Sequence, residues 1–248
     1  MFRNVLKKFK DNYLFMLPFI LVNYAISAAA DIMAGGEGQI VNKYNTVFNK
    51  GNFFEGINKA GLILFIISIV LGPLIYCSMS VISKKVFRDE EINIGESVKE
   101  ASKYYFRYIL LALLIAAMVI GLTMGIGLIA LMGPLVVLTP VLLIIMVAYM
   151  IIYEPCSEYL VYHDVSPEQA LKEGKKVGKK YYFSLLGIII VSSVIGYIVQ
   201  KFYNDNLTIN LIVSFIIVNI NAFFVMFRIN LCHMEYLELE EVEETEVY

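Results

Sequence analysis

Five long stretches without a charged residue alternate with short charged segments along the chain. They cover 12–30, 60–83, 108–153, 181–200 and 206–227. A helix needs about 20 apolar residues to cross the ~30 Å hydrocarbon core of a bilayer. Four stretches therefore fit one crossing each. The stretch 108–153 fits two, with Gly133-Pro134 as the turn. We predict an all-α, polytopic membrane protein with six transmembrane helices arranged as three hairpins.

The composition agrees with this prediction. The chain has 248 residues, of which 59% are hydrophobic and only 17% are charged. Soluble domains average about 45–50% apolar and about 25% charged residues, so a bilayer is the solvent that accounts for the difference. We expect a transmembrane domain over 1–235, followed by an acidic cytoplasmic tail over 236–248.

Lys and Arg residues are distributed unevenly between the two sides of the predicted bundle. Of the 20 in the chain, all but four fall on the side of the N-terminal arm. The four on the other side are Lys43, Lys50, Lys59 and Lys201. Because Lys and Arg are enriched in cytoplasmic segments, we expect a multi-pass protein of the cell membrane with both termini in the cytoplasm.

The tetrapeptide KYYF occurs twice, at 103–106 and at 180–183, each time between a charged segment and a long apolar stretch. A weaker copy at 10–15 begins the first helix. Lysines suit anionic headgroups and tyrosines suit the headgroup layer, so we interpret these segments as interfacial anchors, each preceded by an amphipathic helix in the membrane surface. The anchor residues are Lys103, Tyr104, Tyr105, Lys180, Tyr181 and Tyr182. The spacing predicts hairpin repeats over 1–91, 92–165 and 166–235, although a positive inner side and an aromatic belt produce similar junctions without duplication.

The segment that begins at Ser166-Pro167 has the sequence of a well-capped helix, with Gln169 at its third position. We expect Ala170, Leu171 and Val177 to face the lipid and the lysines to face water and headgroups. The same segment resembles, in part, the cytoplasmic loop of ABC-importer permeases that docks into the ATPase. That resemblance implies a coupling helix with Glu168, Ala170 and Gly174 as its motif residues. Gln169 replaces the middle alanine of that motif, and the I-x-L-P that follows it in the family is missing.

Two further sets of residues are predicted to hold helices together. Ala117, Gly121 and Gly125 recur every fourth residue, and such a stripe lets another helix approach closely, either inside the bundle or between protomers. Glu154 and Arg228 lie at the inner ends of the fourth and sixth helices. A charge so near the hydrocarbon should be paired, so we expect these two residues to form an ion pair.

Motifs for catalysis are missing from the sequence. It has no HExxH, GxSxG, P-loop or CxxC, so we expect no enzyme, no cofactor and no metal site, and we expect no nucleic-acid partner. The last 14 residues hold seven Glu and no basic residue. This end is either a solvated extension of the sixth helix or an acidic segment that docks on the basic loops or on a partner.

The segments 166–172 (SPEQALK) and 180–186 (KYYFSLL), together with the six-helix layout, resemble a group of bacterial and archaeal polytopic proteins of unknown function. That group is similar to the membrane domain of some glycerophosphoryl diester phosphodiesterases. The resemblance concerns the membrane domain, so their enzymatic activity is not expected here. We expect a non-catalytic accessory or lipid-contacting subunit, with anionic headgroups and a cytoplasmic protein as partners. The alternative is a transport subunit, either an ABC-type permease or a small-solute carrier.

Overall fold

The computed structural model describes residues 1–33, 59–131, 137–201 and 206–246, and the regular secondary structure within these ranges is helical. Among them, four helices are long and apolar enough to cross a membrane, or six if each of two bent pairs counts as one span. The helices are α1 (Phe2–Asp11), α2 (Tyr13–Met33), α4 (Lys59–Phe87), α5 (Ile94–Leu131), α6 (Thr139–Tyr153), α7 (Cys156–His163), α8 (Pro167–Lys180), α9 (Tyr182–Gln200) and α10 (Leu207–Glu246).

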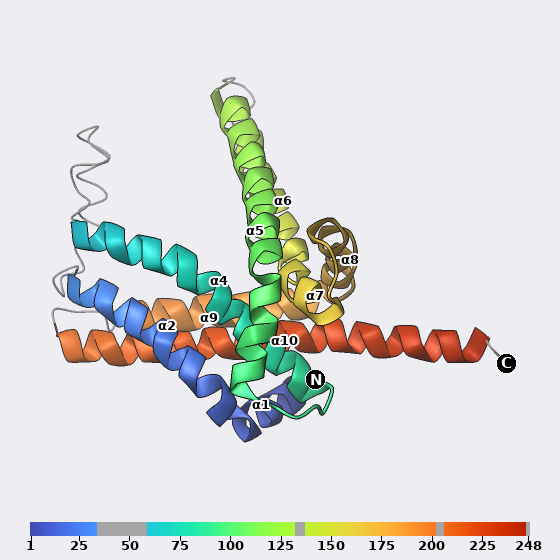
Figure 1. Ribbon diagram of the computed structural model, residues 1–248. Coiled ribbons are helices and arrows are strands. Elements are labelled where there is room, and N and C mark those ends of the chain that lie inside the picture. The colour runs from blue at the N-terminus through green and yellow to red at the C-terminus, as the bar shows by residue number, and fades with distance from the viewer. Residues whose placement is uncertain (34–58, 132–136, 202–205, 247–248) are drawn as a thin grey trace.

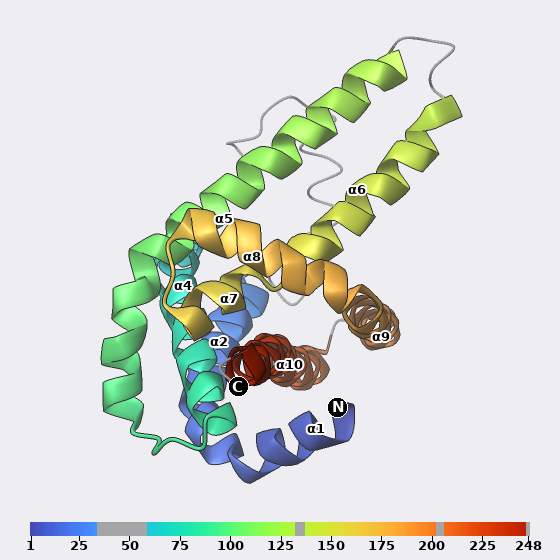
Figure 2. The ribbon, with the colours of Figure 1, turned by 90° about the vertical axis from the view of Figure 1, so that its right-hand side faces the viewer.

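Helix α10 is the central element of the bundle. It packs against α1, α2, α4, α7, α8 and α9, and a view along its axis shows these helices around it (Figure 2). Val218, Ala222 and Phe227 of α10 are buried in the main apolar core. Other apolar side chains of 206–227, such as Ile212 and Ile216, are exposed, so this stretch is apolar on its open side as well, as a membrane span is.

The α5–α6 hairpin runs crosswise to α2, α4, α9 and α10 (Figure 1). In the apolar part of Ile94–Ile129, only 6% of the residues are buried inside the structure. Large apolar side chains on this hairpin are exposed, among them Leu113, Ile120, Leu128 and Ile144. A surface of this kind is stable only in a non-aqueous environment, so it fits a membrane protein. The first turns of α5 pack on α4, α7 and α8, whereas the rest of the hairpin projects away from α2, α9 and α10, so the predicted arrangement as three hairpins is not confirmed.

Two of the three predicted interfacial helices are separate elements. The helix α1 meets α2, and α8 meets α9, at bends of 83° in both cases. The bends lie at Asn12 and Tyr181, whose backbones leave the helical conformation. The side-chain amide of Asn12 donates a 2.9 Å hydrogen bond to the carbonyl of Lys8 and so helps to end α1.

The third predicted interfacial helix is not separate. Before the third predicted crossing, α5 runs without a break from Ile94 to Leu131 and includes the first KYYF segment. No Gly or Pro lies between Glu96 and Ile120, so nothing in the sequence interrupts the backbone hydrogen bonds there. The expectation of an interfacial helix at each of three junctions is therefore wrong at this one.

Helix α8 packs on protein along the face that we expected to enter lipid. Its start has the predicted capping box, formed by Ser166 and Gln169. Ala170 and Val177 are buried, at 0% and 1% exposed. A Cβ at Gly174 would lie 2.8 Å from Cα of Cys156, and one at Gly178 would overlap the Ile152 carbonyl at 1.9 Å. The small residues of α8 thus let it approach the α6–α7 junction more closely than larger side chains would permit.

The stripe Ala117, Gly121 and Gly125 of α5 does not make the contact predicted for it inside the bundle. A Cβ built at Gly121 or Gly125 meets nothing within 4 Å, and Ala117 is exposed. This part of α5 meets α6 through other residues, such as Thr123 beside Met146, and it projects away from α2, α9 and α10. Packing between protomers through this stripe stays a prediction.

The glycines of α8 give a direct test of this packing. We expect Gly178→Ala to lower the stability of the purified protein by at least the ~1–3 kcal/mol typical of overpacking, because its methyl group has no room beside Ile152. Gly187→Ala in α9 is the matched control, because it adds the same methyl group in open space. The control should match or slightly exceed the wild type, since Ala favours a helix more than Gly does. Thermal unfolding in detergent measures both, and equal midpoints would contradict the close approach.

Candidate functional site

Many cations of the chain gather at one end of the bundle, which we call the basic end. It carries Lys8, Lys85, Arg88, Arg107 and Lys180. Several of them join separate helices through an acidic partner. Lys8 Nζ lies 3.1 Å from Asp89 Oδ1 and donates a 2.9 Å hydrogen bond to the carbonyl of Val86, which fixes α1 to the end of α4. Lys85 Nζ lies 3.6 Å from Glu100 Oε2 and joins α4 to α5.

Arg88, directly after α4, is held by aromatic rings. Its guanidinium lies 4.7 Å from the ring centre of Tyr162 and 5.3 Å from that of Tyr236. The hydroxyl of Tyr162 lies 2.8 Å from Nδ1 of His233. A cation over two aromatic faces is stabilised by both rings, so this cluster connects α4, α7 and α10.

Beneath the basic end, the buried charges meet at Arg228 of α10. Its Nε donates a hydrogen bond to Oε1 of Glu158 on α7, and its Nη2 donates one of 3.2 Å to the hydroxyl of Tyr76 on α4. The Tyr76 hydroxyl donates in turn to the same carboxylate oxygen. Glu158 is 0% exposed. A buried carboxylate requires a paired charge, so these three side chains fix α4, α7 and α10 relative to one another.

The partner of Arg228 that we predicted is present at the edge of this cluster. Nη1 of Arg228 lies 3.5 Å from Oε2 of Glu154, whose side chain is 42% exposed. Sequence reasoning missed Glu158, because we ended the fourth crossing at 153 and treated the following residues as a rim. The available signal was the spacing of Glu154 and Glu158, four residues apart and followed by the apolar residues Tyr159-Leu160-Val161.

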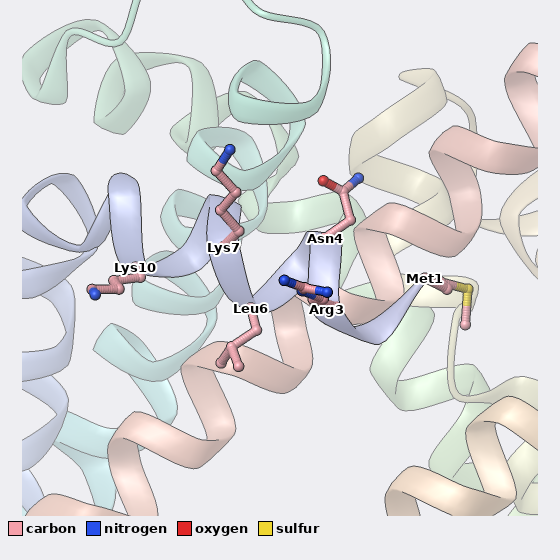
Figure 3. A pocket seen from close by; sticks show the side chains of 6 residues that line it. All are labelled: Met1, Arg3, Asn4, Leu6, Lys7 and Lys10. Carbon is pink, nitrogen blue, oxygen red and sulfur yellow. The ribbon is translucent and has the colours of Figure 1, made fainter.

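The outer face of α1 is a second feature of the basic end (Figure 3). Its inner face is apolar: Val5 is buried, and the rings of Phe2 and Phe9 lie 5.2 and 5.7 Å from that of Phe223 on α10. The outer face borders a shallow hollow of about 720 Å³ without an acidic side chain. Its lining residues are Met1, Arg3, Asn4, Leu6, Lys7 and Lys10. The three cations form no ion pair with other described residues.

The second KYYF segment forms the corner between α8 and α9. Lys180 Nζ lies 2.6 Å from Oε2 of Glu235 and also contacts Glu238, both on α10. The hydroxyl of Tyr181 donates a 3.3 Å hydrogen bond to Oε1 of Glu238. Lys180 donates hydrogen bonds to the two carboxylates, which raise the pKa of the lysine above its ordinary value. Tyr182 is half-buried against the core.

The first KYYF segment is used differently. Tyr104 is 3% exposed and packs in a second apolar cluster with Cys77, Val81 and Leu160, so its predicted place among headgroups is wrong. Lys103 is exposed and Tyr105 is half-buried on the same helix. The phenylalanine that closes each KYYF is strongly exposed, 79% for Phe106 and 84% for Phe183. The two segments share an outward Phe but differ in what holds their tyrosines.

The three residues that suggested a coupling helix are divided between two faces of α8. Glu168 is exposed, whereas Ala170 and Gly174 are buried against the α6–α7 junction. Close helix packing therefore explains why small residues stand at two of the three positions, Ala170 and Gly174, that resemble the permease loop. The coupling role itself stays a prediction.

The buried ion pair leads to a stability prediction. We expect Arg228→Met or Glu158→Met alone to cost about 3–5 kcal/mol, because each leaves a buried charge without its partner. The double substitution should cost much less than the sum, because no unpaired charge remains. Glu154→Gln is the control and should cost about 1 kcal/mol or less, since that carboxylate is half-exposed. Equilibrium unfolding in mixed micelles measures all four variants, and additive losses in the double variant would contradict the pairing.

Comparison with protein-family models, with curated proteins and with solved structures gave no match for this chain. The resemblance to the membrane domain of glycerophosphoryl diester phosphodiesterases therefore stays a prediction. We therefore base the proposed function on the geometry of the basic end.

Proposed function

We propose that this chain is a non-catalytic integral membrane protein whose basic end contacts anionic lipid headgroups, as an accessory or lipid-contacting subunit. The observation that carries the proposal is the outer face of α1, where Arg3, Lys7 and Lys10 border a hollow without an acidic side chain (Figure 3). Exposed Leu6 lies among these cations. A helix that presents cations and apolar side chains together is suited to the boundary between headgroups and acyl chains.

The bend between each short helix and the next one supports this proposal. An angle of 83° brings α1 and α8 close to the membrane plane if α2 and α9 cross the bilayer. Each bent pair then supplies one span, and the proposed total of six requires the α5–α6 hairpin to align with the other helices in the bilayer. The exposed phenylalanines Phe106 and Phe183 suit the edge of the hydrocarbon at the two KYYF segments.

We place the basic end, and with it both termini, in the cytoplasm of the cell. The Lys and Arg excess at this end is the basis of the assignment. The transport alternative stays a prediction. The buried positions of Ala170 and Gly174 remove part of its support, since close helix packing also requires small residues there.

The orientation can be tested with single introduced cysteines. Lys172 of α8 and Lys201 after α9 are both exposed and lie at opposite ends of the bundle. In intact cells, a membrane-impermeant maleimide should label Lys201→Cys and leave Lys172→Cys unlabelled until the membrane is opened. The native cysteines Cys77, Cys156 and Cys232 are all buried, so the parent chain is the background control. Labelling of Lys172→Cys in intact cells would place the basic end outside.

The lipid contact can be tested by native mass spectrometry of the protein with added phosphatidylglycerol or phosphatidylcholine. We expect the wild type to bind the anionic lipid more tightly and Arg3→Gln/Lys7→Gln/Lys10→Gln to lose most of that preference. Each cation near an anionic surface contributes about 1 kcal/mol, so a single Lys7→Gln should weaken the preference by up to about fivefold.

Lys201→Gln is the matched control for Lys7→Gln, because it removes one exposed lysine at the opposite end of the bundle. It should leave the preference unchanged. An equal loss in the two single variants would show a general effect of net charge. A wild type without any preference for the anionic lipid would refute the proposed function.

A further inference from the structure

The α8–α9 corner differs from the outer face of α1 in one respect: its lysine is already bound to acidic groups of the same chain. Lys180 Nζ lies 2.6 Å from Glu235 and also contacts Glu238, and Tyr181 donates a hydrogen bond to Glu238. Arg3, Lys7 and Lys10 form no such pair with the described residues. Lys180 and the Tyr181 hydroxyl, which we expect to contact a lipid phosphate, thus face the carboxylates of Glu235 and Glu238.

These carboxylates belong to the part of α10 that continues past the bundle. Glu235 and Glu238 lie three residues apart, so one face of the helix presents both of them to the corner. They are the first two of the seven glutamates between 235 and 248. Another face of the same turn has different partners: the ring of Tyr236 lies under the guanidinium of Arg88, and its hydroxyl bonds to Glu240.

A carboxylate and a phosphate diester offer a lysine the same chemistry, a compact anion that accepts charged hydrogen bonds. Lys180 and Glu238 are accessible, at 39% and 50% exposed, whereas Glu235 is 19% exposed. Ion pairs that reach solvent are weak and are screened by salt. An anionic headgroup that arrives at the corner can therefore replace the carboxylates without breaking the core beneath them.

We propose that the acidic end of α10 is an intramolecular competitor of anionic lipid at the α8–α9 corner. In lipid with few anions, Glu235 and Glu238 occupy Lys180 and Tyr181 and hold this part of α10 against the corner. In lipid rich in anions, headgroup phosphates take the two donors, and the helix beyond Glu238 is released from that side. The inference rests on the proposed lipid contact and assigns a regulatory segment to it.

The first test compares two charge-matched double variants by native mass spectrometry with phosphatidylglycerol. Glu235→Gln/Glu238→Gln removes the competitor, and we expect it to raise the apparent affinity about two- to fivefold, the range that corresponds to an exposed ion pair. Glu91→Gln/Glu96→Gln removes two exposed acids that do not touch Lys180 and lie outside α10, and it should change the affinity less. Adding Lys180→Gln to the first variant should cancel its gain.

The outcomes separate this inference from the proposed function. If the wild type prefers phosphatidylglycerol but both double variants gain equally, net charge is the cause and the competitor is refuted. If no form of the protein prefers phosphatidylglycerol, the proposed lipid contact has failed as well. Circular dichroism of each variant ensures that affinities are compared between folded proteins.

The second test follows the segment itself. A spin label at Leu239→Cys, an exposed position of α10 next to Glu238, reports local mobility by electron paramagnetic resonance. In nanodiscs, replacing phosphatidylcholine by phosphatidylglycerol should raise the mobility of this label in the wild type. In Glu235→Gln/Glu238→Gln the label should be mobile in both lipids. A label that is equally immobile in all four samples would overturn the proposal.

Discussion

The pairing of Arg228 with Glu158 is the interaction on which the assembly of the bundle depends. Both side chains lie where apolar helices pack together, and a charge there is costly unless it is paired and hydrogen-bonded. Glu158 has no exposure at all, so its position on α7 is fixed by Arg228 on α10 and Tyr76 on α4. These contacts fix α4, α7 and α10, which are distant in the sequence, relative to one another. The basic end lies directly next to this buried cluster.

The basic end combines this fixed base with groups that remain accessible. Two cations are held by contacts within the protein: Arg88 lies against two tyrosine rings, and Lys8 donates a hydrogen bond to the carbonyl of Val86. The cations of the outer face of α1 are not, and Lys180 is occupied only by carboxylates that solvent can reach. The same residue types are therefore either held by contacts within the protein or left accessible, and the difference lies in which partner the fold brings near.

The sequence predicts the helical class with its long apolar helices, the cap of α8 and the pairing of Arg228 well, because each depends on local pattern or on the cost of burying a charge. It predicts contacts between helices poorly. Ala117-x-x-x-Gly121-x-x-x-Gly125 and Ala170-x-x-x-Gly174-x-x-x-Gly178 have the same spacing. Only the second approaches another helix closely, because α8 lies across the α6–α7 junction, while the part of α5 that carries the first stripe projects away from α2, α9 and α10. A stripe of small residues permits a close approach, but the partner comes from tertiary structure.

The repeated KYYF segment makes the same point about chemistry. Where the helix continues without interruption, as in α5, Tyr104 turns onto α4 and α7 and becomes part of the core. Where the helix bends, as between α8 and α9, Lys180 and Tyr181 lie at an outer corner and meet the glutamates of α10. The bend follows the residues that precede the motif: α8 carries two glycines packed on α6–α7, and the first turns of α5 carry none after Gly95. The backbone before each copy thus decides what its side chains meet: Tyr104 is buried, whereas Lys180 and Tyr181 face the glutamates of α10 at the corner where we propose that a lipid phosphate replaces them.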